Sequence, residues 1–169
     1  RLPHVSPARP ASTTAYLEPM DCVIAQLTGV IGANQCTQFT ALLCDNRTLG
    51  GTEYDPELVR MSGVDPATLP PLLSLTDAIG PLRPEIAAQL GIPASAIVHA
   101  PINDSHAGAI ATGARRPDRV ALMIDTTLVL LETTHRHGTD LDHDALSMPC
   151  PFPGISGEQQ SVLQSLNKI

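Results

Sequence analysis

Apolar residues recur at helical spacing in the first part of the chain, between short groups of turn-forming residues. Residues 20–27 place apolar side chains at i, i+3, i+4 and i+7, which is one face of a helix, and Gly29 follows as its stop signal. A second apolar stripe over residues 36–43 predicts another helix. Helices are also predicted within 56–63 and 84–91, because each range opens with proline and closes with glycine.

The hydrophobic pattern changes after residue 95. The apolar run at residues 96–98 predicts a short buried strand, and the Ala- and Gly-rich residues 105–113 predict a helix that packs closely against a neighbour. Two further apolar runs, 120–124 and 128–131, are separated by three polar residues, which predicts a hairpin. Strands and helices therefore alternate, and the pattern predicts an α/β fold.

Three further segments complete the prediction: a lead-in, a loop and a last helix. The proline-containing residues 1–13 predict an extended lead-in, and the polar, Pro- and Gly-rich residues 135–156 predict a loop. Residues 158–166 predict a last helix. Hydrophobic residues make up 43% of the chain and charged residues 16%, a balance typical of a globular protein.

Charge and cysteine content narrow the classes of partner and compartment. The net charge of -7 argues against nucleic acid and against anionic membrane surfaces, because both attract basic patches. No apolar run approaches the roughly 20 residues that span a bilayer, and no signal peptide is visible. Four cysteines without CxxC spacing fit a reducing compartment, so we expect a cytoplasmic protein.

One order of residue types suggests phosphoryl transfer. Asp104 follows a strand and starts a helix, where a carboxylate is well placed to take a proton from a hydroxyl group. Thr126 and Thr127 lie in the hairpin bend, where hydroxyls and backbone N–H groups suit phosphate oxygens. The alternatives remain open, because aspartate at a helix start is commonly a cap and threonine in a bend is commonly a turn residue.

Histidines at two places in the chain have competing interpretations. His106 either lines a substrate pocket and affects the proton affinity of Asp104, or is a packed histidine of the core. A second group combines histidine and aspartate in a loop: His135, His137, His143, Asp140, Asp142 and Asp144. Its spacing fits no zinc pattern, so we interpret it as a solvated turn and predict no metal site.

Several short motifs resemble, in order, those of the FGGY carbohydrate kinases, such as xylulokinases. The matching stretches are Leu27–Gly29 (LTG), Phe39–Asp45, Gly63–Pro71 (GVDPATLPP), Gly80–Pro84, Leu90–Pro93, Asn103–Gly108 (NDSHAG), Phe152–Pro153 and Gly157–Ser161 (GEQQS). Each motif is short, but their order and gaps match over nearly the whole chain. The LTG and GVDP stretches favour sugar kinases over the actin-like ATPases.

The resemblance implies an actin/hexokinase-like (ribonuclease H-like) fold, present here in incomplete form. Asp104 matches the catalytic base, and its neighbours Asn103, Ser105 and His106 would contact a small sugar or polyol. Asp125, Thr126 and Thr127 match the phosphate loop that binds ATP, with Mg²⁺ carried by the nucleotide. The implied domains are residues 14–117, the end of the first kinase domain, and 118–169, the start of the second.

The chain also departs from the family pattern. Asp125 and Leu128 stand where the family has glycines, and a carboxylate there would repel the γ-phosphate. The family's early Asp-Gly-Thr phosphate motif and its adenosine-binding part have no counterpart, so we expect the chain alone to be inactive. The alternative is a non-catalytic remnant or interaction protein. Either way, exposed apolar faces would favour homo-oligomers.

Overall fold

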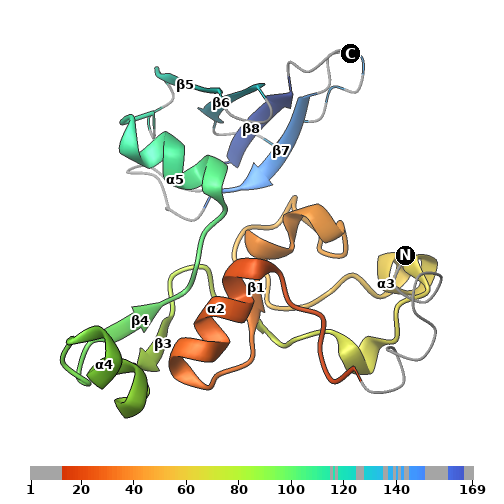
Figure 1. Ribbon diagram of the computed structural model, residues 1–169. Coiled ribbons are helices and arrows are strands. Elements are labelled where there is room, and N and C mark those ends of the chain that lie inside the picture. The colour runs from red at the N-terminus through yellow and green to blue at the C-terminus, as the bar shows by residue number, and fades with distance from the viewer. Residues whose placement is uncertain are drawn as a thin grey trace.

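The computed structural model describes residues 13–114, 116, 118–124, 128–134, 137, 138, 140, 142, 145–150 and 160–165. Its elements, in chain order, are α2 (Pro19–Thr28), β1 (Ala33–Asn34), the 3₁₀ helix η2 (Thr37–Ala41), α3 (Pro56–Ser62), η3 (Pro66–Thr68), β2 (Leu72–Leu73), β3 (Ala78–Pro81), α4 (Pro84–Leu90), β4 (Ile97–His99), α5 (Asp104–Ala111), β5 (Val120–Ile124), β6 (Leu128–Thr134), β7 (Ala145–Pro149) and β8 (Gln160–Ser165) (Figure 1). The predicted α/β class is confirmed.

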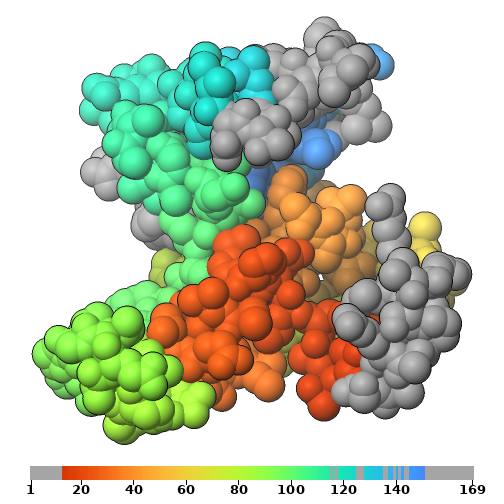
Figure 2. Space-filling model, viewed as in Figure 1, coloured from red at the N-terminus to blue at the C-terminus, as the bar shows by residue number. Residues whose placement is uncertain are grey.

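The molecule has two parts that meet at a narrow middle (Figure 2). One part contains α5 and the sheet β5–β6–β8–β7, and the other contains the helices and short strands that precede α5 (Figure 1). The segment between β4 and α5 connects them, and η2 lies beside the start of α5 in the middle of the molecule. This junction is where Asp104 lies.

The four-stranded sheet is antiparallel throughout. β5 and β6 pair with Ile124 opposite Leu128, so the predicted hairpin is confirmed. The helix predicted over residues 158–166 is wrong, because Gln160–Ser165 forms the inner strand β8 between β6 and β7. Hydrogen bonds to two neighbouring strands outweigh the local helical pattern there. The loop predicted over 135–156 is likewise interrupted by β7, which pairs with β8.

Helix α5 covers one face of this sheet. The core beneath it consists of small and aliphatic side chains: Ala109, Ala114, Ala121, Leu131 and Met148, with Phe39 and Met123 packed against them. A Cβ atom at Gly108 would lie 2.6 Å from Met123 Sδ, so the close packing predicted for the Ala- and Gly-rich helix is confirmed. The opposite face of β5 exposes Val120, Leu122 and Ile124.

The helices of the other part begin and end where the sequence predicts. α2, α3 and α4 each begin at a proline, and the residues after them, Gly29, Gly63 and Gly91, have positive φ angles. At Gly29, φ is 81°, a left-handed conformation that residues with a side chain rarely adopt. The motifs that resemble those of the sugar kinases thus include real helix ends.

Two predictions in this part need correction. The stripe at residues 36–43 forms the short 3₁₀ helix η2, because the Asn34 side chain binds the first N–H groups and Leu42 leaves the helix with φ 56°. The strand at 96–98 exists as β4, but it is not buried. Ile97 is 52% exposed, since β4 pairs only with β3 in a two-stranded sheet.

Candidate functional site

Asp104 is the first residue of α5, and its carboxylate is exposed. Its Oδ1 accepts hydrogen bonds from the backbone N–H of Ser105 at 2.7 Å and from Ser105 Oγ at 3.4 Å. Among the described residues, no cation forms an ion pair with this carboxylate. An exposed, unneutralised carboxylate can accept a proton from a bound hydroxyl group.

Asn103 and Ser105 flank Asp104 and have structural roles of their own. The Asn103 side chain caps α5 by accepting from the backbone N–H of Ser105 at 2.8 Å. The N–H of Ser105 therefore serves both neighbouring side chains, which draws the Asn103 amide and the Asp104 carboxylate toward the same point. The predicted substrate-binding residues lie together with Asp104 at the beginning of the helix.

His106 lies in the core and not on an open surface. Only 2% of it is exposed, its Nδ1 lies 3.1 Å from Cys36 Sγ, and its Nε2 is buried without a hydrogen-bond partner. Burial lowers the pKa of His106 to about 4, although the charge of Asp104 acts in the opposite direction. The geometry therefore favours the packed histidine of the two interpretations, with a neutral ring at neutral pH.

Cys36 and Asn34 belong to this site, and sequence reasoning missed them. Cys36 Sγ accepts from the backbone N–H of Asn103 at 3.4 Å, and Asn34 Nδ2 donates to the carbonyl oxygen of Pro101 at 2.8 Å. The order Asn34-Gln-Cys-Thr37 is a recognisable side-chain-to-backbone turn signal. No local signal shows that both residues also contact a segment 67 residues later.

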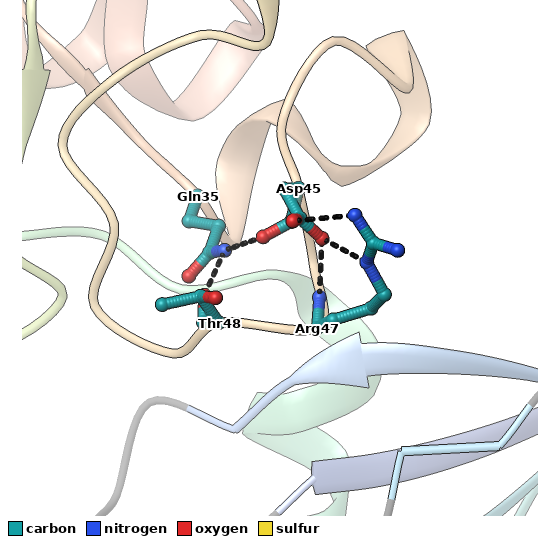
Figure 3. Close-up of polar contacts among 4 residues, drawn as sticks. All are labelled: Gln35, Asp45, Arg47 and Thr48. Atoms are coloured by element: carbon teal, nitrogen blue, oxygen red, sulfur yellow. Dashed lines mark hydrogen bonds and ion pairs between the residues drawn. The ribbon is translucent and has the colours of Figure 1, made fainter.

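The neighbouring side chain, Gln35, serves a different loop (Figure 3). Its Nε2 donates to the carbonyl oxygens of Asp45 at 3.0 Å and Thr48 at 2.7 Å, and its Oε1 accepts from the N–H of Gly50 at 3.1 Å. At the loop surface, the Asp45 carboxylate accepts from Arg47 Nε at 2.7 Å (Figure 3). The hydrogen bonds from Arg47 lower the pKa of Asp45 to about 2.

Asp21 is a second buried titratable group beside this stretch. It lies on α2, is 1% exposed, and its Oδ2 accepts from Gln38 Nε2 at 3.4 Å. Its Oδ1 is buried without a hydrogen-bond partner. Burial raises the pKa of Asp21 to about 6, and the nearby Thr37 and Gln38 side chains only partly offset that effect.

The remaining predicted positions give less information. Asp125, Thr126 and Thr127 lie outside the described residues, as do His135, His143 and Asp144. Of the histidine and aspartate group, His137, Asp140 and Asp142 are described and exposed. Within the described part of the chain, no three His, Cys, Asp or Glu side chains are arranged to bind a metal ion.

The structure contains hollows away from Asp104. A groove of about 590 Å³ lies along α3 and η3, with Tyr54, Val59, Arg60 and Leu69 among its lining residues. A space of about 10 Å³, the size of one water molecule, adjoins Asn34 and Pro101 among other residues. No described helix is long and apolar enough to cross a membrane.

Comparison with known proteins finds sugar kinases that contain a similar stretch of sequence. No protein-family model matches the chain. It is 29% identical over 133 residues to a putative sugar kinase, YoaC, of Bacillus subtilis (strain 168), covering 79% of this chain and 26% of that protein. It is also 29% identical over 119 residues to the xylulose kinase of the same organism, covering 70% and 23%. The chain thus spans about a quarter of these relatives' length.

Solved structures agree with these relatives. The xylulose kinase of Rhodospirillum rubrum superposes with a TM-score of 0.79 at 20% identity, over 97% of this chain and 32% of that chain. A ligand-bound xylulose kinase of Lactobacillus acidophilus gives 0.72 at 19% identity, over 87% and 28%. The glycerol kinase of Plasmodium falciparum with ADP gives 0.69 at 15% identity, over 86% and 28%.

At such low identities, the structural likeness establishes the fold and not the activity. The sequence relatives add that the same stretch of chain occurs within sugar kinases. The predicted actin/hexokinase-like fold and the predicted resemblance are both confirmed. This chain is similar to a segment of the FGGY carbohydrate kinases and has the fold of that segment.

Proposed function

We propose that this chain is part of an ATP-dependent carbohydrate kinase in which Asp104 is the general base. The observation that carries the proposal is the exposed carboxylate of Asp104 at the start of α5, next to a buried and hydrogen-bonded helix turn. The substrate is a hydroxyl group of a small sugar or polyol, as the resemblance implies. The enzyme acts in the cytoplasm, as the cysteine content suggests.

In this proposal, the chain's own residues handle the proton and the orientation of the hydroxyl group. ATP, bound with Mg²⁺, supplies the phosphoryl group. Asp104 accepts the proton of the attacking hydroxyl, whose oxygen forms the new bond to phosphorus as ADP departs. Asn103 and Ser105 line the same helix start and orient the sugar. His106 supports this turn from the core.

In this proposal, residues 125–127 between β5 and β6 bind the phosphate groups of the nucleotide. Thr126 and Thr127 supply hydroxyls to the phosphate oxygens in this proposal, and the bend joins β5 to β6. Residues 14–117 then form the end of the first kinase domain, and 118–169 the start of the second. The close packing of Gly108 against Met123 connects the helix of the proposed base to the strand that precedes the bend.

A non-catalytic role is the second candidate, and one feature of the sequence favours it. Asp125 occupies a position where the family has glycine, so its charge would repel a γ-phosphate. An interaction protein could retain the fold without turnover. Replacing Asp125 with glycine tests the repulsion: the dissociation constant for ATP, measured by calorimetry, should fall. An unchanged or weaker affinity would contradict it.

The main experiment measures sugar-dependent ATP consumption with a panel of pentuloses and polyols. It is run with this chain and with a longer native protein that contains it. Asp104→Asn should lower kcat by about 10²–10⁴-fold, the usual contribution of a general base. Asp55→Asn is the matched control, since Asp55 is a half-buried aspartate at a helix start and asparagine preserves its cap.

The two outcomes separate the candidate functions. Activity that is lost with Asp104→Asn and kept with Asp55→Asn supports the kinase. No sugar-dependent ATP consumption in either protein would favour the non-catalytic role. Wild-type kcat in Asp104→Asn would falsify the assignment of Asp104 as the base while leaving the kinase activity in place.

A further inference from the structure

The segment around Asp104 is bound at three points by one short stretch of chain. Asn34 Nδ2 donates to the carbonyl oxygen of Pro101 at 2.8 Å, and the N–H of Asn103 donates to Cys36 Sγ at 3.4 Å. Cys36 Sγ also lies 3.1 Å from His106 Nδ1. These contacts lie on both sides of Asp104 in the sequence, so the helix turn that carries it is fixed from before and after.

The stretch that makes these contacts is itself well ordered by hydrogen bonds. Asn34 Oδ1 accepts from the N–H of Cys36 at 2.9 Å and from the N–H of Thr37 at 3.0 Å. Thr37 Oγ1 accepts from the N–H of Asn34 at 3.1 Å. Asn34 is 1% exposed and Cys36 is fully buried, so water does not compete for these bonds.

The other half of α5 packs against the sheet. Ala109 belongs to the core beneath the helix, and Gly108 lies against Met123 of β5. Displacing the first turn would therefore tilt the Asp104 carboxylate relative to both parts of the molecule. A misplacement of about 1 Å in a catalytic group can cost on the order of a hundredfold in rate.

We propose that Asn34 and Cys36 are positioning residues for Asp104, which bind the turn around it and thereby fix the direction of its carboxylate. The inference rests on the proposed function for the role of Asp104 as base. Neither Asn34 nor Cys36 is proposed to touch the substrate. Their effect on the reaction passes through the backbone of residues 101–106.

Gln35 provides a matched control within the same stretch. It is as buried as Asn34 and also makes three side-chain hydrogen bonds to backbone groups, but all three go to residues 45–50. Asn34→Asp and Gln35→Glu are both amide-to-acid changes of unchanged shape. Each removes an N–H₂ donor that faces backbone carbonyl oxygens and retains the acceptor oxygen.

The first test does not depend on activity. Hydrogen exchange of the 169-residue chain, followed by mass spectrometry, compares the amides of residues 101–108 with those of 45–50. Asn34→Asp should accelerate exchange about tenfold or more in 101–108, and Gln35→Glu should do so in 45–50. Equal acceleration of both segments by both variants, or unchanged exchange of 101–108 in Asn34→Asp, overturns the proposal.

The second test uses steady-state kinetics of the active longer protein. Asn34→Asp should lower kcat about tenfold while the KM for ATP stays within about twofold, because only the base is misplaced. Cys36→Ala should lower kcat similarly, and Cys36→Ser should restore part of it, since serine retains a donor and an acceptor. Gln35→Glu should leave kcat unchanged. A fall in kcat as large in Gln35→Glu as in Asn34→Asp contradicts the positioning role.

The two tests fail separately. If wild-type protein consumes no ATP with any sugar, the proposed function fails, and the exchange pattern alone decides whether Asn34 and Cys36 fix the turn. If Asn34→Asp does not fold cooperatively, the Cys36→Ala and Cys36→Ser variants carry the same exchange comparison. If residues 101–108 exchange as fast in Cys36→Ser as in Cys36→Ala, that result counts against the proposal.

Discussion

Two adjacent buried amides, Asn34 and Gln35, illustrate how similar chemistry produces different consequences. Each is 1% exposed, and each makes three side-chain hydrogen bonds to backbone groups. The bonds of Gln35 stay within a loop at most 15 residues away, whereas one bond of Asn34 reaches Pro101, 67 residues away. Asn34 can therefore influence the candidate base and Gln35 cannot, because only Asn34 is bonded to the segment that carries Asp104.

Their surroundings differ as well. Two of the three bonds of Asn34, to the N–H groups of Cys36 and Thr37, are buried, whereas its bond to Pro101 and all three bonds of Gln35 are partly buried. The loop fixed by Gln35 also carries the exposed pair of Asp45 and Arg47 (Figure 3). Water can replace part of each bond that Gln35 loses on mutation, but little of the two buried bonds that Asn34 loses.

The largest expected effect comes from deleting both amides in turn. Asn34→Ala should lower the free energy of unfolding by roughly 3 kcal/mol, because three bonds are lost and two of their partners are buried and left unpaired. Gln35→Ala should cost less, about 2 kcal/mol, because its partners are partly hydrated. Urea unfolding followed by circular dichroism measures both values. Equal losses would break the comparison.

Asp21 and His106 are buried titratable groups that contact Gln38 and Cys36, and their contributions to stability should depend on pH in opposite ways. The folded state favours protonated Asp21, so its contribution to stability is present below pH 3.8 and lost as the pH rises through about 6. The folded state favours neutral His106, so its contribution is present above pH 6.5 and lost as the pH falls through about 4.

The two contributions oppose each other between about pH 4 and 6. Asp21→Asn should therefore become more stable as the pH rises over this range, by roughly 2–3 kcal/mol, and His106→Gln should become less stable by a similar amount. Urea midpoints at several pH values provide the measurement. Parallel profiles for the two variants would show that one of these groups is not buried.

The labelling rates of Cys36 and Cys44 report on the hydrogen bonds of Asn34 and of Gln35, respectively. Both thiols are buried, whereas Cys22 is exposed and should react first with a thiol reagent. Asn34→Asp should accelerate the labelling of Cys36 about tenfold, and Gln35→Glu should accelerate that of Cys44, which adjoins the loop. Peptide mapping after timed labelling distinguishes the sites. Faster labelling of Cys44 in Asn34→Asp would mean that the networks are coupled.

The smallest effect is expected at the surface of the Gln35 loop. Arg47→Ala removes the ion pair with Asp45, but both groups are exposed and screened by water. The urea midpoint should remain within error of the wild type. A clear loss of stability would show that the exposed pair, and not Gln35, fixes the loop.

Local signals predicted the elements that local forces decide. Proline at the first turn and glycine after the last predicted α3 and α4, because these residues restrict or release the backbone wherever they occur. Apolar periodicity and Gly29 predicted α2. The alternation of apolar runs with a polar bend placed the hairpin of β5 and β6 in the same way. Asp104 became the candidate base through a motif that resembles that of the sugar kinases, and its role stays a prediction.

Other features could not be predicted because they depend on partners far along the chain. Residues 160–165 form a strand only because β6 and β7 lie on either side of them. His106 has two interpretations from the sequence, and its burial beside Cys36 favours the packed histidine.

By itself, the sequence determined the helix ends, the hairpin and the resemblance to the sugar kinases, since each depends on residues that are close together in the chain. Only the tertiary structure decided which buried side chains meet the turn that carries Asp104. Hydrogen bonds between Asn34 or Cys36 and residues 101–106 form when folding brings distant segments together and excludes water. No pattern of neighbouring residues encodes that meeting.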